Sequence, residues 1–406
     1  MGYTLTGDMG YTWRMPWRTL TPMSQRLEFV VLATQSGIAF SELCRRFAVS
    51  RKTGYKWLTR YKADGAEGLK ERSRCPHHSP KQVSPAVAEV VIALRQETTW
   101  CGRKLRRRLQ DLGHRDVPAA STCTEILRRA SLLETEQPRG PMQRFERQLP
   151  NELWQMDHKG DFATQAGPRC HPLTVLDDHS RYNLILDAAG NQRTATVQIA
   201  LTAAFERYGL PEAILCDNGG PWGNVSEGAG HTPLTVWLLR LGVRVLHGRP
   251  YHPQTQGKEE RFHRTLKREL LSRHTWRDLA HCAELFPRYR QRYNHERPHD
   301  SLDGDTPVAR YRPSVRALPS HLPLPEYAEM HVRIVRAKGV ITFGNQTWYI
   351  GEAFAALPVG LRPSPQADGQ WEVYFFHFKL GLLDLSTPNA TKHIARRLSS
   401  IRSPKD

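Results

Sequence analysis

Apolar residues near the start of the chain recur at the spacing that is typical of short amphipathic helices. Between residues 23 and 63 they fall at positions i, i+3, i+4 and i+7 in three successive segments, so each segment can bury one face. Ser41 and Ser50 stand where the second and third helices are expected to begin, and serine is a favoured N-cap. We therefore predict a helix-turn-helix unit at 23–63, preceded by a disordered lead at 1–22.

The third predicted helix turns a basic face to solvent when its apolar residues Trp57, Leu58 and Tyr61 point inward. In a helix-turn-helix unit this helix lies in the major groove of DNA, so we expect its exposed side chains to contact DNA. An ordinary three-helix bundle with a solvated basic face is the alternative. The expected DNA-binding residues are Arg51, Lys52, Tyr55, Lys56 and Arg60.

A second helical segment follows a charged, glycine-containing linker at 64–83. It begins at Ser84-Pro85, a cap residue followed by proline at the first helical position, where no backbone N–H is needed. The pattern predicts a second helix-turn-helix unit at 84–134 and another linker at 135–150. Its basic run is the densest in the chain, and we expect DNA contact there, with a solvated face as the alternative. The run comprises Arg103, Lys104, Arg106, Arg107 and Arg108.

From residue 151 onward, the pattern predicts strands that alternate with helices. The expected order is three strands, a helix, a strand, a helix, a strand and a long helix at 256–271, which is the order of a ribonuclease-H-like α/β domain. We place this core at 151–312. Strand-like alternation resumes at 320–390, where we expect a small β-barrel-like domain, followed by a basic tail at 391–406. The predicted fold class is multidomain: all-α N-terminal units, a central α/β core and a small, mostly-β C-terminal domain.

Charge and cysteine content narrow the possible partners. The chain has 58 lysine and arginine residues against 40 aspartate and glutamate residues, a formal net charge of +18, which favours a polyanion such as nucleic acid. Its seven cysteines form no Cys-x-x-Cys pair, so neither a disulfide framework nor a zinc finger is indicated. No apolar run approaches the ~20 residues of a membrane span, so we expect a cytoplasmic, nucleoid-associated protein without a membrane partner.

Three carboxylates stand where an α/β core builds its active site. Asp157 lies in the first predicted core strand, and Asp217 lies at the carboxyl end of a short buried strand. Glu260 falls in the first turn of the helix at 256–271. Carboxylate oxygens suit hard cations, so we expect two Mg²⁺ ions, for which Mn²⁺ can substitute. Two such ions ~3.5–4 Å apart activate the attacking oxygen and stabilise the leaving oxygen in phosphodiester chemistry.

Other ionisable residues near these positions have simpler interpretations. Surface turns explain Asp161, Asp177 and Asp178, although each could approach the metal ions. Arg264 and Lys267 lie four and seven residues after Glu260 and therefore share its helix face, where we expect phosphate contacts; a solvated stripe is the alternative. Groove or surface roles are expected for the histidines, which have no Cys or His partner at zinc spacing: His247, His252, which we expect to position DNA, and His263.

The motifs around the three carboxylates resemble a known family. Trp-Gln-x-Asp, Cys-Asp-Asn-Gly and Pro-Tyr-His-Pro-Gln-Thr-Gln-Gly-Lys-x-Glu-Arg look like the DDE core that retroviral integrases and bacterial insertion-sequence transposases share. Gly68-Leu-x-Glu-Arg-Ser-Arg and Tyr293-Asn-x-x-Arg-Pro-His-x-x-Leu with Thr306-Pro307 also resemble the transposase group. The resemblance covers roughly residues 15–312. It implies that the catalytic and metal-binding triad is Asp157, Asp217 and Glu260, with Asp157 as a ligand of both ions.

The chain departs from the family pattern at one point. The stretch between Asp217 and Glu260 is longer than is typical, which we attribute to an enlarged loop at 223–231. Glu259 is the nearest rival for the third acidic position. We favour Glu260 because it directly precedes Arg261, as the motif requires.

The resemblance implies a DNA transposase. Residues 23–134 would bind the element's terminal inverted repeats, and the core would hydrolyse a phosphodiester to free a 3′-hydroxyl and direct it onto target DNA. We expect a homo-oligomer on DNA. The alternatives are a domesticated helix-turn-helix regulator without catalysis and a ribonuclease-H-type nuclease without strand transfer. The presence of all three acidic residues argues against the regulator, and the two N-terminal units argue against the nuclease.

Overall fold

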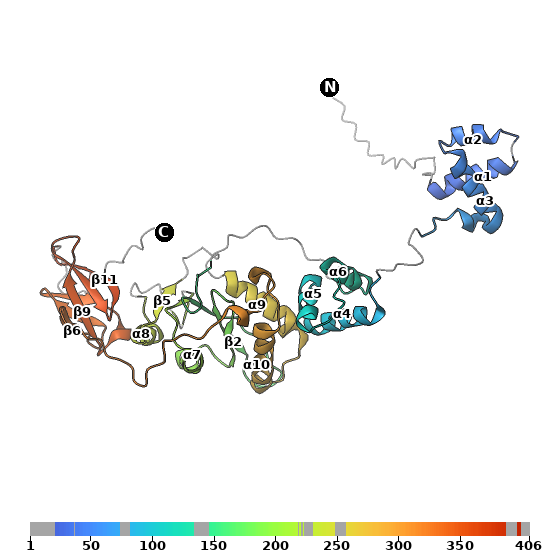
Figure 1. Ribbon diagram of the computed structural model, residues 1–406. Coiled ribbons are helices and arrows are strands. Elements are labelled where there is room, and N and C mark those ends of the chain that lie inside the picture. Colours follow the sequence, from blue (N-terminus) through green and yellow to red (C-terminus); the bar gives the residue numbers. More distant parts are fainter. Residues whose placement is uncertain are drawn as a thin grey trace, which may run out of the picture. The chain divides into compact units, whose positions relative to one another are not determined.

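The computed structural model describes residues 21–35, 37–73, 82–133, 146–217, 219–220, 222, 230–247, 257–386 and 396–398. The chain divides into two compact units, Met1–Gln82 and Val83–Asp406, and each is described by itself (Figure 1). Most of the expected lead and tail lies outside the described residues, as does part of each expected linker. Among the helices that the structure describes, none combines the length and the apolar character needed to cross a membrane.

Within its described residues, the first unit has three helices and a 3₁₀ turn, which enclose one apolar core. Phe29, Leu43 and Trp57 come from different helices and are buried together. Gly54 permits this close packing, because a Cβ there would lie 2.9 Å from the Cys44 sulfur. The elements are α1 (Pro22–Gln35), α2 (Phe40–Arg46), α3 (Arg51–Asp64) and η1 (Gly65–Leu69).

Of the two N-caps predicted in this unit, one is confirmed and the other is wrong. The Ser50 hydroxyl accepts a 3.1 Å hydrogen bond from the backbone N–H of Thr53, so Ser50 caps α3 as expected. The expected cap at Ser41 is wrong, because α2 begins one residue earlier, at Phe40, with Ala39 in the cap position. Ser41 therefore already lies inside the first turn, where a side chain cannot act as the N-cap.

The second helical segment also forms three helices around an apolar core. Ser84 caps the first of them by accepting from the backbone N–H of Val87, as the sequence predicts. Gly102 lets the second helix begin directly against the third, because a Cβ there would lie 2.7 Å from the Ala120 carbonyl oxygen. These helices are α4 (Pro85–Thr98), α5 (Gly102–Asp111) and α6 (Ala120–Arg129).

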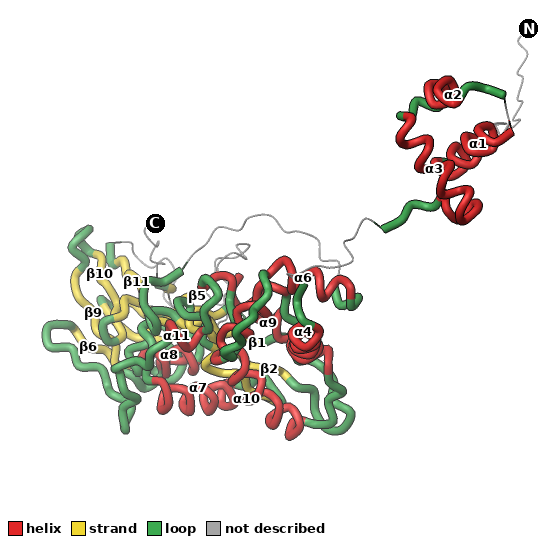
Figure 2. Tube along the Cα trace, turned by 45° about the vertical axis from the view of Figure 1, so that its right-hand side comes forward, coloured by secondary structure: helices red, strands yellow, loops and turns green. Residues whose placement is uncertain are grey.

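The central part of the chain folds around a five-stranded mixed sheet in the order β3-β2-β1-β4-β5. The pairs β1–β2 and β2–β3 are antiparallel, whereas β1–β4 and β4–β5 are parallel. The predicted class, an α/β core between an all-α front and a strand-rich end, is confirmed (Figure 2). The strands are β1 (Trp154–His158), β2 (His171–Asp177), β3 (Asn183–Ala189), β4 (Ala213–Cys216) and β5 (Arg244–His247).

Helices cover both faces of this sheet. Side chains alternate between the faces along a strand, so β2 contributes Leu173 and Val175 to the cluster with α7 and α8 but Leu176 to the cluster with α9 and α10. The helix that carries Glu260 therefore packs on the opposite face from α7. The helices are α7 (Thr194–Tyr208), α8 (Pro233–Arg240), α9 (Gly257–Glu269), α10 (Leu279–His295) and α11 (Pro307–Arg310), with 3₁₀ turns η4 (Leu271–Arg273) and η5 (Asp300–Leu302).

A buried ion pair joins the end of α9 to the chain that follows α10. The Arg297 Nε donates to both carboxylate oxygens of Glu269, at 3.0 and 3.2 Å, and both side chains are buried. Asn294 ties α10 to β3, because its side chain bonds both the N–H and the C=O of Asn183 at 2.8 and 2.9 Å. Asn294 and Arg297 both belong to the Tyr293-Asn-x-x-Arg motif, which thus fixes α9 and α10 on the sheet.

The C-terminal part is strand-rich, as predicted, and its strands form two sheets around one apolar core. Trp348, Phe354 and Phe375 are buried in that core together with Val236 and Leu239 of α8, so the core reaches into the domain of the five-stranded sheet. The strands are β6 (His331–Ile334), β7 (Val340–Phe343), β8 (Gln346–Tyr349), β9 (Pro358–Pro363), β10 (Gln370–Phe375), β11 (Phe378–Asp384) and β12 (Arg396–Arg397), with η6 (Glu352–Phe354) between β8 and β9.

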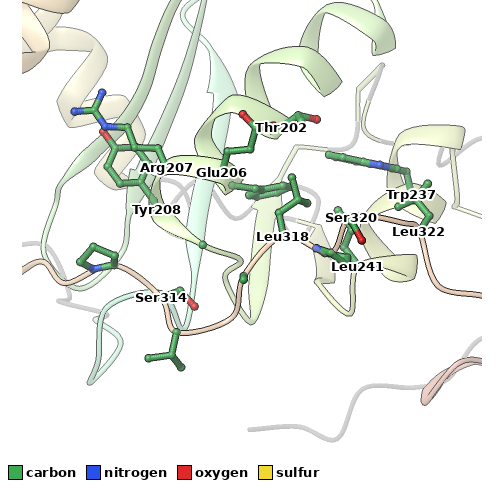
Figure 3. Close-up of a pocket in the computed structure, with 16 residues that line it drawn as sticks. Thr202, Glu206, Arg207, Tyr208, Trp237, Leu241, Ser314, Leu318, Ser320 and Leu322 are labelled. Atoms are coloured by element: carbon green, nitrogen blue, oxygen red, sulfur yellow. The ribbon is translucent and has the colours of Figure 1, made fainter.

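The segment that connects the two domains runs beside α7 and α8 and borders a groove of about 710 Å³ (Figure 3). Arg316 holds this segment in place, because its guanidinium donates to the carbonyl oxygens of Pro211, Leu241 and Gly242. Tyr208 and Trp237 line the groove. None of its lining residues is one of the three acidic residues, so the groove is separate from the chemistry expected from the sequence.

The Arg297–Glu269 pair leads to a stability prediction. Arg297→Met leaves a buried carboxylate without its partner, so we expect the free energy of unfolding to fall by ~3–5 kcal/mol. Adding Glu269→Leu should recover most of that loss, because an apolar pair then replaces the ion pair. Arg288→Met breaks an exposed pair with Glu284 and should cost only ~0.3–0.5 kcal/mol. Urea unfolding of the full chain measures all three, and equal losses for Arg297→Met and Arg288→Met would contradict the role of burial.

Candidate active site

The three predicted acidic residues lie on neighbouring elements of the core. β1 and β4 are parallel, and Gln155 of β1 pairs with Leu215 of β4. Asp157 and Asp217 each come two residues after a member of this pair, so they lie side by side at neighbouring strands. Glu260 lies in the first turn of α9. Burial, with smaller contributions from the negative charges of Asp217 and Glu260, raises the pKa of Asp157 to about 6. Asp217 and Glu260 are therefore both near the Asp157 carboxylate.

The described residues do not form a closed metal-binding cluster. Among them, no group of three His, Cys, Asp or Glu side chains is arranged to hold a metal ion. Asp217 is held instead by its neighbours: its Oδ1 accepts from the backbone N–H of Gly219 at 3.0 Å, and its carbonyl oxygen lies 3.0 Å from Nδ1 of His247. The enlarged loop expected at 223–231 and the motif before α9 that includes His252 lie mostly outside the described residues.

The adjacent residues Glu259 and Glu260 face opposite environments. Glu259 is only 1% exposed, and its Oε2 accepts a 3.1 Å hydrogen bond from the Thr174 hydroxyl of β2. Burial raises the pKa of Glu259 well above the ordinary range. Glu260 is exposed, as are Arg264 and Lys267, so these three residues share the solvent face of α9. Of the two glutamates, Glu260 is the one whose carboxylate is accessible from solvent.

His263 lies at the acidic site, where sequence reasoning expected only a groove or surface role. It is buried, its Nε2 lies 2.8 Å from the Thr174 hydroxyl, and its Nδ1 lies 3.8 Å from a carboxylate oxygen of Asp157. Burial lowers the pKa of His263 to about 3, so the ring is neutral at physiological pH. Its position four residues after Glu259, one helical turn along α9, was the signal in the sequence that could have placed it here.

Asp177 and Asp178 are both buried, so the expectation that they lie in surface turns is wrong. Asp177 accepts from the backbone N–H of Asn151 at 2.7 Å and from both the N–H and the hydroxyl of Ser180. It therefore organises the turn between β2 and β3 and the chain before β1. Asp161, in contrast, is exposed and pairs with Arg169, as a surface residue would.

Asp178 connects the two segments that carry Asp157 and Glu260. Its Oδ1 accepts a 2.7 Å hydrogen bond from the Gln155 side chain and lies 2.5 Å from the Lys258 ammonium. Gln155 precedes Asp157 by two residues in β1, and Lys258 precedes Glu260 by two residues in α9. Sequence reasoning missed this contact, although Gln155 and Lys258 both belong to the motifs that surround the acidic residues.

In the first unit, the predicted DNA-binding residues line one side of α3. Arg51, Lys52, Tyr55 and Lys56 are exposed. Arg60 is half-buried, with its guanidinium 5.2 Å from the centre of the Trp57 ring. In the second helical segment, Arg103 and Arg106 of α5 are exposed. Lys104, Arg107 and Arg108 are half-buried and form ion pairs with acidic side chains of the core.

Family models match most of the described chain. The integrase core domain matches residues 147–253, and a second model of the integrase core domain matches residues 241–307. A helix-turn-helix domain matches residues 25–77, and a homeodomain-like domain matches residues 53–127. The C-terminal domain of IS481 family transposases matches residues 330–391. The chain thus contains an integrase core domain, helix-turn-helix domains and the C-terminal domain of IS481 family transposases.

Proteins of insertion elements are among the relatives of this integrase-core chain. An uncharacterized 31.7 kDa protein of insertion element IS407 from Burkholderia multivorans is 29% identical over 154 residues, which is 38% of this chain and 53% of that protein. The chain thus spans about half of that relative. An uncharacterized 39.2 kDa protein of IS476 from Xanthomonas euvesicatoria is 25% identical over 280 residues, 67% of this chain and 78% of that protein.

Solved structures of retroviral proteins are also similar to this integrase-core chain. A chain of the simian T-cell lymphotropic virus intasome, solved with the PP2A regulatory subunit B56 gamma, is 15% identical with a TM-score of 0.37, covering 70% of this chain and 91% of that one. The HTLV-2 integrase catalytic core domain in complex with magnesium is 15% identical with a TM-score of 0.32, covering 41% and 99%. The fold assignment rests on the strand order described above.

The Asp178 contacts lead to a prediction about the start of α9. Asp178→Asn removes a buried negative charge beside the Lys258 ammonium, so we expect amide hydrogen exchange at residues 257–261 to become several-fold faster. Asp161→Asn is the matched control, because it breaks an exposed pair with Arg169 and such pairs contribute little. Mass spectrometry of the two full-length variants measures the exchange. Unchanged exchange in Asp178→Asn would show that Asp178 does not anchor α9.

Proposed function

We propose that this chain is a DNA transposase that hydrolyses a phosphodiester at the ends of its element and joins the freed 3′-hydroxyl to target DNA. The observation that carries the proposal is the position of Asp157 and Asp217 at neighbouring parallel strands, beside the first turn of the helix that carries Glu260. Carboxyl ends of parallel strands are where α/β sheets build their sites. The integrase core domain and the IS481 transposase C-terminal domain support the same activity.

Asp157, Asp217 and Glu260 are the residues that would hold the divalent ions, two Mg²⁺ for which Mn²⁺ can substitute. The donor set fits, because all three ligands supply hard carboxylate oxygens. Burial is the main cause of the raised pKa of Asp157, and the negative charges of Asp217 and Glu260 add to it; a bound cation would offset those charges. When bound, the ions supply activation of the attacking oxygen and stabilisation of the leaving oxygen.

The remaining residues of the site bind and position. Arg264 and Lys267 share the exposed face of α9 with Glu260, so we propose that they contact phosphates of the DNA near the scissile bond. Glu259, Thr174 and the neutral His263 form the buried polar layer behind Asp157. Because His263 is neutral, it adds no positive charge that would compete for the Asp157 carboxylate.

We propose that the chain binds two kinds of DNA, the terminal inverted repeats of its element and the target DNA. Arg51, Lys52, Tyr55 and Lys56 of α3 form the exposed set that would enter the major groove, with Arg60 at the edge. A homo-oligomer on DNA follows from the need to hold two element ends together. Association with the nucleoid belongs to the same proposal.

The catalytic assignment predicts that Asp157→Asn, Asp217→Asn and Glu260→Gln each abolish cleavage and joining while DNA binding survives. A neutral amide keeps the shape of the side chain but removes the charge that holds a cation. Glu259→Gln is the matched control and should retain most activity, because burial already favours the neutral form of Glu259. Strand transfer in Mg²⁺, with labelled duplexes taken from the DNA that flanks the coding sequence, measures activity.

Two results would change the catalytic assignment. Substantial strand transfer by any one of the three variants would remove that residue from the site. Loss of activity in Glu259→Gln, together with an active Glu260→Gln, would move the third acidic role to Glu259. If the unaltered chain binds the element's ends but shows no cleavage in Mg²⁺ or Mn²⁺, the chain is a DNA-binding regulator instead.

The DNA-binding assignment predicts different behaviour for the two helical units. Alanine at Arg51, Lys52 and Lys56 should erase the preference for the element's end over random DNA, because an Arg or Lys contact with guanine contributes ~1–3 kcal/mol of discrimination. Alanine at the exposed Arg103 and Arg106 should weaken both DNAs alike and flatten the log–log salt slope by about 0.9 per lost phosphate contact. Competition binding at two salt concentrations separates the outcomes. A uniform loss with intact preference in the α3 variant would show that α3 is not the reader.

A further inference from the structure

Some side chains in the basic run of α5 are exposed to solvent, and others are largely buried. Arg103 is 79% exposed on its side chain, and Arg106 is also exposed. On the other side of the helix, the side chains of Lys104 and Arg108 are only 12% and 21% exposed. A helix that used its whole basic run for DNA would leave all of these side chains accessible. The inward residues of α5 therefore have a partner within the chain.

That partner is an acidic segment that directly follows α10. The Arg108 guanidinium lies 2.5 Å from the Glu296 carboxylate, and the Lys104 ammonium lies 3.5 Å from the Asp300 carboxylate. Three acidic residues within 296–305 thus meet one face of a single helix. The ion pairs are Arg103–Asp300, Lys104–Asp300, Arg107–Asp305 and Arg108–Glu296. Arg107 also pairs with Asp111 of its own helix, at 2.9 Å.

A second set of contacts holds the end of α4 to the core. The Arg273 guanidinium donates to the backbone carbonyl oxygens of Gln96 and Glu97, at 2.6 and 2.5 Å. These carbonyls belong to the last turn of a helix, where they have no partner within the helix and carry the negative end of its dipole. Arg292 also pairs with the Glu97 carboxylate at 2.8 Å. Both α4 and α5 are therefore held against the core, each by its own set of contacts.

The acidic segment is itself held rigidly. Arg297, directly after Glu296, forms the buried pair with Glu269. His299 is buried, and its backbone N–H donates to the carbonyl oxygen of Asp305 at 3.0 Å. The segment that resembles the transposase motif after Tyr293 is therefore a pre-formed surface, and the proposed chemistry assigns no role to its three acidic residues.

We propose that Glu296, Asp300 and Asp305 form a docking surface for α5 of the same chain, and that this surface, rather than DNA, is the partner of Lys104, Arg107 and Arg108. This contact fixes the second helix-turn-helix unit on the domain of the five-stranded sheet. Arg106 stays exposed, and Arg103 is 79% exposed although it lies 3.5 Å from the Asp300 carboxylate. The inference stands on contacts between residues of one compact unit and does not depend on the proposed reaction.

The test is a charge swap in the full-length chain without DNA or metal. Arg108→Glu and Glu296→Arg each place like charges opposite one another, so each should make amide exchange several-fold faster in both 102–111 and 296–305. The double variant Arg108→Glu/Glu296→Arg restores opposite charges and should return exchange in both segments toward that of the unaltered chain. The two segments are far apart in sequence, so coupled changes report on contact between them.

Arg106→Glu is the matched control, because it reverses an exposed charge on the same helix. It should leave exchange at 296–305 unchanged. If either single swap variant does not fold, Arg108→Gln and Glu296→Gln remove the same ion pair without placing like charges together, and each should make exchange in both segments faster. Unchanged exchange at 296–305 in the single variants would overturn the proposal, and so would a double variant that stays as fast as the singles. Because no cleavage is measured, this outcome is independent of the catalytic assignment.

Discussion

The buried ion pair between Arg297 and Glu269 holds the end of α9, the helix that carries Glu260, against the chain that follows α10. A buried charge that loses its partner is strongly destabilising, so neither side chain can leave this contact without cost. The same helix begins with Glu259 and Glu260, and its first turn is held through Lys258 and Asp178. A helix fixed at both ends is a rigid support for an acidic residue. The proposed phosphodiester chemistry would need such rigidity, because misplacement of a ligand weakens the interactions made in the transition state.

The site combines an exposed carboxylate with a buried polar layer. Successive residues of a helix point in different directions, so Glu259 enters the protein while Glu260 remains on the surface. Thr174 and His263 satisfy the buried carboxyl group without adding charge. Two acidic residues in sequence thus differ in character because of their surroundings alone. The same principle separates the inward and outward cations of α5.

Periodicity predicted the fold class, but not the helix α10 (Leu279–His295) that follows the acidic helix. The order of strands and helices, the caps at Ser50 and Ser84 and the strand-rich end depend on local spacing, which the sequence displays directly. The contacts of Asp178 could not be predicted in this way, because its partners Gln155 and Lys258 become neighbours only after the chain has folded. The inward half of the basic run on α5 was missed for the same reason: its acidic partners follow α10, far along the chain. A run of charged residues in a sequence suggests an exposed surface, because the sequence does not show which distant residues of opposite charge will pair with it.

The shared core between α8 and the C-terminal strands has a consequence for how the chain unfolds. Val236 and Leu239 complete the apolar interior of the strand-rich domain, and Arg316 holds the connecting segment by three carbonyl oxygens. The two domains are therefore joined by burial as well as by covalent linkage. Separating them would expose the outer face of α8 to water and create an apolar patch of the kind that promotes aggregation. They belong to one compact unit, although they are two domains by fold.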